Sequence, residues 1–135
     1  MTTRLLAAWG AAFVTMLVID GVWLGVVAKN LYRDAIGHLM ADQFNFGAAA
    51  VFYLLYPIGV VALAVVPNAE SPGWTSTLVA AAIFGFIAYA TYDLTNLATL
   101  KGWPVSIALI DMAWGTAVTV AMAAAARWAY LALRG

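Results

Sequence analysis

The sequence predicts an all-α integral membrane protein: a bundle of four transmembrane helices with a short interfacial helix between spans 1 and 2. Hydrophobic residues make up 66% of the 135 residues and charged residues only 9%, far from the roughly 45–50% and 25% usual in soluble domains. Four apolar runs are also long enough to cross a bilayer, which takes about 20 helical residues. At this length we expect a single membrane domain over residues 1–135.

The elements follow in order along the chain. The first run continues through Asp20 and lacks a convincing small-x-small cleavage site, which predicts a retained helix rather than a signal peptide. Residues 29–45 form the longest polar segment, and their interspersed leucines and aromatic residues predict a short helix lying in the interface. A very short turn separates spans 3 and 4, so these two helices must be antiparallel neighbours. The predicted spans are residues 5–28, 46–66, 75–100 and 104–126.

Composition excludes several kinds of site and partner. The chain has no cysteine, and His38 is its only histidine, which excludes disulfides, thiolate catalysis and metal sites built on sulfur or on several histidines. We therefore assign no metal ligands and leave the cofactor unknown. The formal net charge is zero, so no nucleic acid is expected as a partner. Positive side chains are equally numerous on the two sides, and the amino-terminal amine favours termini in the cytoplasm.

Three aspartates interrupt the predicted spans at a common depth. Counted from the nearest interface, Asp20, Asp93 and Asp111 lie seven to nine residues into their helices. At a rise of about 1.5 Å per residue, all three are about 10–14 Å from one and the same interface. Carboxylates this close cannot all stay ionised without a cation, so we expect a coupled titration or a bound positive group.

Other polar and aromatic side chains are expected in the same layer. Tyr89, Asp93 and Asn96 are spaced i, i+4, i+7 and share one face of span 3. Asp20 and Asp111 both begin the pattern Asp-x-x-Trp, which predicts a ring lying over the carboxylate of its own helix. The expected ligand-binding residues are Asp20, Trp23, Tyr53, Tyr56, Tyr89, Tyr92, Asp93, Asn96, Asp111 and Trp114.

Each feature also has a purely structural interpretation. The aspartates can join helices by hydrogen bonds, although intramembrane carboxylates are costly and mostly mark pathways or sites. Gly21 and Gly25 match the Gly-x-x-x-Gly pattern of helix contacts. His38 is expected to be an interfacial residue, with a proton relay as the alternative. Arg127 and Arg134 are expected to anchor lipid headgroups.

Several of these motifs also carry a resemblance to a known family. The chain resembles a bacterial family of small predicted membrane proteins catalogued as domain of unknown function 2177, and the resemblance covers nearly its whole length. It implies a four-span protein of the bacterial inner membrane, and no activity comes with it. The shared motifs are Tyr92-Asp93-Leu-Thr-Asn96-Leu-Ala-Thr-Leu, Trp103-Pro104, Asp111-x-x-Trp114-Gly115, Asp20-x-x-Trp23-Leu24 and Tyr32.

The sequence supports three functions, all in contact with the lipid bilayer. The first is a binding or transport protein whose carboxylate layer receives a proton, a metal ion or a small organic cation, with a homodimer needed to enclose a pathway. The second is a membrane-embedded enzyme acting on a lipid or isoprenoid, with an aspartate as general acid/base or Mg²⁺ ligand. The third is an accessory subunit of a membrane complex. Whether the protein is an enzyme stays open.

Overall fold

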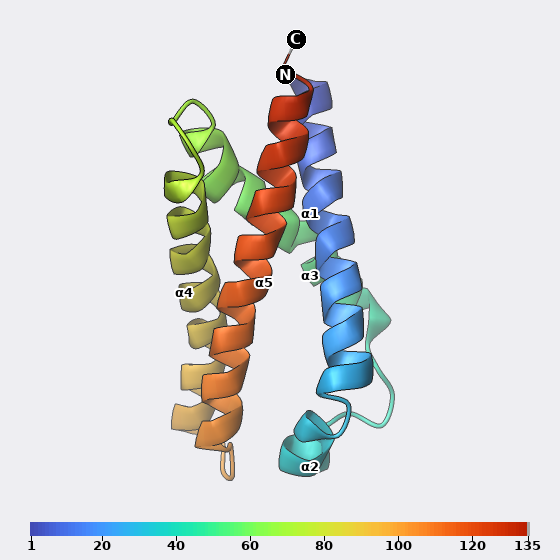
Figure 1. Ribbon diagram of the computed structural model, residues 1–135. Helices are drawn as coiled ribbons and strands as arrows, with labels where there is room; N and C mark the ends of the chain where they lie inside the picture. Colours follow the sequence, from blue (N-terminus) through green and yellow to red (C-terminus); the bar gives the residue numbers. More distant parts are fainter. Residues whose placement is uncertain (135) are drawn as a thin grey trace.

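Four long helices form the body of the protein, and both ends of the chain lie at the same end of it (Figure 1). The computed structural model describes residues 1–134. Within this range four helical segments are long and apolar enough to cross a membrane, which confirms the predicted four-span all-α fold. They are Thr2–Val27, Phe46–Asn68, Thr75–Thr99 and Val105–Ala132.

The first two spans change helical type along their length, whereas the last two are continuous α-helices. In the second span, Pro57 lies inside the helix, where it lacks an N–H and its ring crowds the carbonyl four residues earlier. A π-helical turn begins four residues later. Such turns commonly occur where the regular backbone hydrogen bonds of an α-helix are interrupted. The elements are α1 Thr2–Val22 with η1 Trp23–Val27, α3 Phe46–Val60 with η3 Val61–Val65 and η4 Val66–Asn68, α4 Thr75–Thr99 and α5 Val105–Ala132.

The predicted bounds hold within three residues for the first three spans, but the fourth was predicted to end too early. It continues to Ala132 rather than to residue 126. Arg127 does not end the span because its side chain turns inward against the α3–α4 connection, leaving only 3% of the residue exposed. The expectation that Arg127 anchors lipid headgroups is therefore wrong. Arg134, by contrast, is half-exposed and forms an ion pair with Glu70.

The predicted short helix between spans 1 and 2 is present as α2 (Leu31–Ile36), followed by one 3-10 turn over Gly37–Leu39. It lies at the end of the bundle opposite to the termini (Figure 1). Side chains of α2 pack against residues around the α4–α5 turn, so α2 is held across this end of the bundle. The residues in this cluster are Tyr32, Ala35, Ile36, Leu97, Trp103, Ile107 and Ala108.

α5 lies at the centre of the bundle and packs along both α1 and α4. The α4–α5 interface is the most extensive one, which confirms the predicted antiparallel pair. Small residues permit this close approach. A Cβ added to Gly115 would lie 2.0 Å from Cγ of Tyr89, and one added to Gly85 would lie 2.5 Å from Oγ1 of Thr119.

The Gly-x-x-x-Gly pattern in the first span does not mediate a helix contact within the bundle. Gly21 and Gly25 are both exposed, and a Cβ added at either position would meet nothing within 4 Å. The helix contact that the pattern predicts is therefore absent within the described bundle. The close approach occurs instead at the glycines of α4 and α5.

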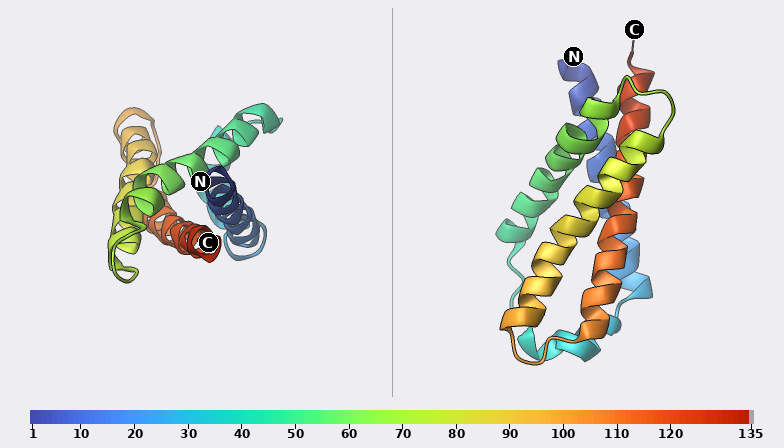
Figure 2. Two further views of the ribbon diagram at one scale, coloured as in Figure 1. Left: turned by 90° about the horizontal axis from the view of Figure 1, so that it is seen from above. Right: turned by 90° about the vertical axis from the view of Figure 1, so that its left-hand side faces the viewer.

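α3 crosses the other helices obliquely (Figure 2). Its span contacts α4 chiefly through η3, near the end of the bundle that holds the termini. Towards α2 the amino-terminal end of α3 stands away from α4, as the view from above in Figure 2 shows. The second and third spans therefore diverge at the level where the aspartates lie.

Candidate functional site

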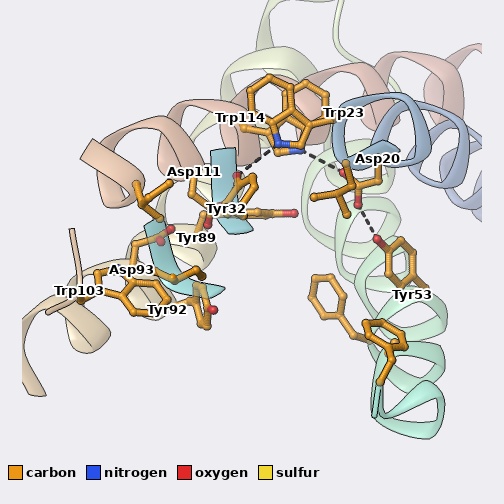
Figure 3. A pocket seen from close by; sticks show the side chains of 16 residues that line it. Asp20, Trp23, Tyr32, Tyr53, Tyr89, Tyr92, Asp93, Trp103, Asp111 and Trp114 are labelled. Atoms are coloured by element: carbon orange, nitrogen blue, oxygen red, sulfur yellow. Dashed lines mark hydrogen bonds between the residues drawn. The ribbon is translucent and has the colours of Figure 1, made fainter. Parts of the chain in front are cut away.

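A cavity of about 320 Å³ lies inside the bundle near α2 and contains all three intramembrane aspartates (Figure 3). Every span and α2 contribute side chains to it, so the three aspartates line one common cavity. Its walls are mostly aromatic. The lining residues are Asp20, Trp23, Leu24, Tyr32, Ile36, Phe44, Ala49, Phe52, Tyr53, Tyr89, Tyr92, Asp93, Trp103, Ile107, Asp111 and Trp114.

Asp20 is fixed by two hydrogen bonds from other spans. The Tyr53 hydroxyl donates to Oδ2 at 2.8 Å, and the Trp114 indole Nε1 donates to Oδ1 at 3.0 Å. Only 7% of Asp20 is exposed. One carboxylate thus joins α1 to α3 and α5, which is the role of interhelical hydrogen bonding that the structural interpretation assigns to it.

Asp111 is reached by a donor from α2. The Tyr32 hydroxyl donates to its Oδ1 at 2.9 Å and itself accepts a hydrogen bond from Nε1 of Trp23 at 3.2 Å. Burial raises the pKa of the Tyr32 phenol above its ordinary value. Tyr32 therefore keeps its proton at physiological pH and remains a donor to Asp111.

The two Asp-x-x-Trp motifs, one on α1 and one on α5, contact each other. The rings of Trp23 and Trp114 stack with centroids 4.3 Å apart and planes 9° apart. Trp114 donates to Asp20 of the other motif, and Trp23 is linked to Asp111 through Tyr32. The hydrogen bonds of the two rings thus cross between α1 and α5, which pack along each other.

Asp93 differs from the other two aspartates because no tyrosine, tryptophan or backbone N–H group donates to it. It is fully buried, and the polar side chain that it meets is the carboxyl group of Asp111 on α5, with which it can share a proton. The indole Nε1 of Trp103 is also buried, has no hydrogen-bond partner among the described residues and lines the same cavity. The Trp103 ring packs edge-on against the Tyr92 ring, with ring centroids 5.7 Å apart. The Asp93 carboxyl group and the unpaired Trp103 indole thus line one cavity (Figure 3).

Eight of the ten predicted site residues line this cavity, and Tyr56 and Asn96 do not. The Tyr56 hydroxyl is hydrogen-bonded to Oγ1 of Thr119 at 2.7 Å, and its ring lines an adjoining cavity of about 380 Å³. Asn96 is half-buried and lines neither cavity. His38 also lies outside both cavities, exposed near the Gly102 turn, as expected of an interfacial residue.

Several lining residues were not predicted as part of the site. Tyr32 and Trp103 were named only among the motifs of the family resemblance, and Phe44 and Phe52 were not singled out. Tyr32, Trp103 and Phe44 belong to the connections between spans. The only available signal was the aromatic content of residues 29–45 in a segment expected to lie against the same end of the bundle.

The described residues do not present the ligand set of a typical metal site. No group of three acidic, histidine or cysteine side chains is close enough to hold an ion within residues 1–134. Asp20 and Asp111 accept hydrogen bonds from tyrosine and tryptophan side chains, whereas Asp93 has only the carboxyl group of Asp111 beside it. Aromatic faces surround it, and such faces attract cations.

Comparison with known proteins identifies one family. A family model described as predicted membrane protein, DUF2177, matches residues 5–128. No curated protein and no solved structure matches the chain significantly. Because the family match covers most of the sequence, including all three intramembrane aspartates, the chain belongs to the predicted membrane proteins of domain of unknown function 2177.

Proposed function

We propose that this membrane protein binds a small organic cation in the carboxylate cavity. The observation that carries the proposal is Asp93: a fully buried carboxyl group that lines the cavity, receives no hydrogen bond from an N–H group, tyrosine or tryptophan of the described residues, and lies against a second carboxyl group, that of Asp111. A buried ionised carboxylate is strongly unfavourable unless a positive group or hydrogen-bond donors accompany it. A bound cation would supply that charge.

The walls of the cavity favour an organic cation over a metal ion. Ammonium groups are attracted to the faces of tryptophan and tyrosine, and aromatic cages are a common way to bind them. Tyr89, Tyr92 and Trp103 supply such rings beside Asp93. A volume of about 320 Å³ falls at the lower end of the range of small-molecule sites. Divalent cations instead need several oxygen ligands converging on one point.

The finer location and assembly are part of the same proposal. We place the protein in the bacterial inner membrane, in line with the family resemblance. Binding needs only one copy of the chain, because a single chain supplies all the residues around the cavity. Transport across the membrane would need a second copy or a rearrangement of α2, since α2 covers the near end of the bundle.

Substitution of Asp93 by asparagine tests the proposal. Purified protein in nanodiscs is titrated with tetramethylammonium chloride, with sodium chloride at equal ionic strength as the reference, and binding is followed by calorimetry and by the fluorescence of the cavity tryptophans. We expect wild-type protein to bind and Asp93→Asn to bind about tenfold more weakly or worse. Asp34→Asn, an exposed carboxylate on α2, should leave the affinity unchanged.

Two results would contradict the proposed function. One is wild-type protein that shows no response to tetramethylammonium beyond that to sodium. The other is an Asp93→Asn protein that elutes as wild type in gel filtration and binds with wild-type affinity. A response to CaCl₂ that exceeds the response to tetramethylammonium would instead support a metal ion as the ligand, against the proposal.

A further inference from the structure

The carboxylate cavity continues into a second cavity that leads towards the lipid. This adjoining cavity of about 380 Å³ shares Phe52, Tyr89, Tyr92 and Asp111 with the first. Its two additional residues, Tyr56 and Ala88, come from α3 and α4. The Tyr56 hydroxyl is already hydrogen-bonded to Thr119. The second cavity therefore extends the site with mainly aromatic and apolar surface.

The second cavity lies where the second and third spans diverge. Their contact is chiefly at η3, and the amino-terminal half of α3 stands away from α4 (Figure 2). Phe52 is 43% exposed and Tyr92 is 54% exposed. Both residues belong to membrane-spanning segments, so the surface that they expose faces acyl chains rather than water. The pair of cavities is therefore open sideways to the bilayer.

The opposite end of the site is covered. α2 packs across the bundle there, with Tyr32 and Ile36 against Trp103. A ligand with its charged group beside Asp93 would thus have that group at the end of the site nearer to α2 and the rest of its body towards the membrane centre. This is the orientation that a lipid-like molecule already has in the membrane.

We infer that the cation is the head of an amphiphile, an alkylammonium compound that enters from the bilayer with its head in the carboxylate cavity and its chain between α3 and α4. The inference rests on the proposed function and goes beyond it by assigning the ligand class and the entry route. Asp93 receives the ammonium group, the aromatic rings surround it, and Ala88 leaves space for the first part of the chain. A water-soluble cation would bind in the same carboxylate cavity, and acyl chains of membrane lipids would then occupy the second cavity.

A competition experiment tests this inference. Wild-type protein in phosphatidylglycerol nanodiscs, whose lipids carry no ammonium head, is loaded with radiolabelled tetramethylammonium, and dodecyltrimethylammonium is added at low mole fraction in the bilayer. We expect the long-chain compound to displace the label. The variant Ala88→Phe should need about tenfold or more of the long-chain compound for the same displacement. The control Ala62→Phe fills a lipid-facing apolar cavity that contains no carboxylate, and displacement should remain as in wild type.

The outcomes separate this inference from the proposed function. Wild-type protein that binds tetramethylammonium but does not release it to dodecyltrimethylammonium would overturn the lateral route and leave the proposed function standing. Displacement that is equally efficient in wild type and Ala88→Phe would overturn the position of the chain. Absence of tetramethylammonium binding in wild type would remove the proposed function and the inference together. The wild-type competition needs no variant to fold, so a failure of displacement there overturns the inference whatever the variants do.

Discussion

Arg127 is a buried cation that the cavity does not use. Its Nη1 donates to the carbonyl oxygen of Asn68 at 2.7 Å and to Oγ1 of Thr77 at 2.6 Å, and its Nη2 donates to the carbonyl oxygen of Ser71 at 3.1 Å. The Trp74 ring lies 5.2 Å from the guanidinium carbon. Arg127 therefore fastens the α3–α4 connection onto α5, because it satisfies carbonyl groups where the second span ends.

We expect Arg127→Met to destabilise the protein by about 2–4 kcal/mol, because hydrogen bonds to a charged group contribute more than neutral ones and their carbonyl acceptors lose a donor. Arg134→Met removes a half-exposed ion pair with Glu70 and should cost less than about 1 kcal/mol. Unfolding in mixed micelles with increasing sodium dodecyl sulfate, followed by circular dichroism, measures both. Equal losses for the two variants would show that Arg127 does not fasten the connection.

Single residues show most directly what a sequence can predict here. The depth of Asp20, Asp93 and Asp111 could be predicted because helical rise is constant, so counting residues gives position along the membrane normal. Their hydrogen-bond partners could not be predicted, because Tyr53 and Trp114 reach Asp20 from helices distant in the chain. The inward orientation of the Arg127 side chain was not predictable either. It depends on the conformation of the α3–α4 connection, and no periodic sequence pattern predicts the conformation of such a loop.

At the scale of elements, the α4–α5 pair is the most tightly packed part of the bundle. Gly115 faces the Tyr89 ring, and Gly85 faces Thr119 and the backbone of Gly115. Tyr89 in turn lines both cavities. The glycines of this interface therefore determine where one aromatic wall of the site stands.

We expect Gly115→Ala to destabilise the protein by about 1–3 kcal/mol, the usual cost of overpacking a filled interface. The Cβ would lie 2.0 Å from Tyr89 Cγ, so the ring must move and tetramethylammonium binding should weaken as well. Gly21→Ala is the matched control, because a Cβ there meets nothing within 4 Å and alanine favours a helix. Unfolding in sodium dodecyl sulfate compares the two. A Gly115→Ala protein as stable as Gly21→Ala would contradict the close packing.

Element types and bounds were predictable to a greater degree than element directions. Apolar runs separated by polar turns located the spans, because a bilayer demands a minimum helical length. The oblique course of α3 was not predictable. It depends on how Pro57 and the following π-helical turn are accommodated against neighbouring helices, and the same sequence pattern is compatible with a straight span. The lateral opening beside Phe52 could therefore not be predicted from the sequence.

For the molecule as a whole, four spans place α2 and the carboxylate cavity at the end opposite to both termini (Figure 1). The orientation of the bundle thus decides which leaflet the cavity serves. With the termini in the cytoplasm, as the sequence predicts, the cavity belongs to the outer leaflet of the membrane. A ligand entering between α3 and α4 would then come from that leaflet.

Single cysteines test this topology cleanly, because the natural chain contains none. Thr3→Cys and Pro72→Cys mark the end with the termini, and Asp42→Cys and Lys101→Cys mark the end with α2; all four positions are exposed. A membrane-impermeant maleimide added to spheroplasts should label the second pair and, only after lysis, the first. Labelling of the first pair alone would reverse the orientation and assign the cavity to the inner leaflet. Different behaviour within either pair would contradict the four-span fold, because the two members of each pair lie at the same end of the bundle.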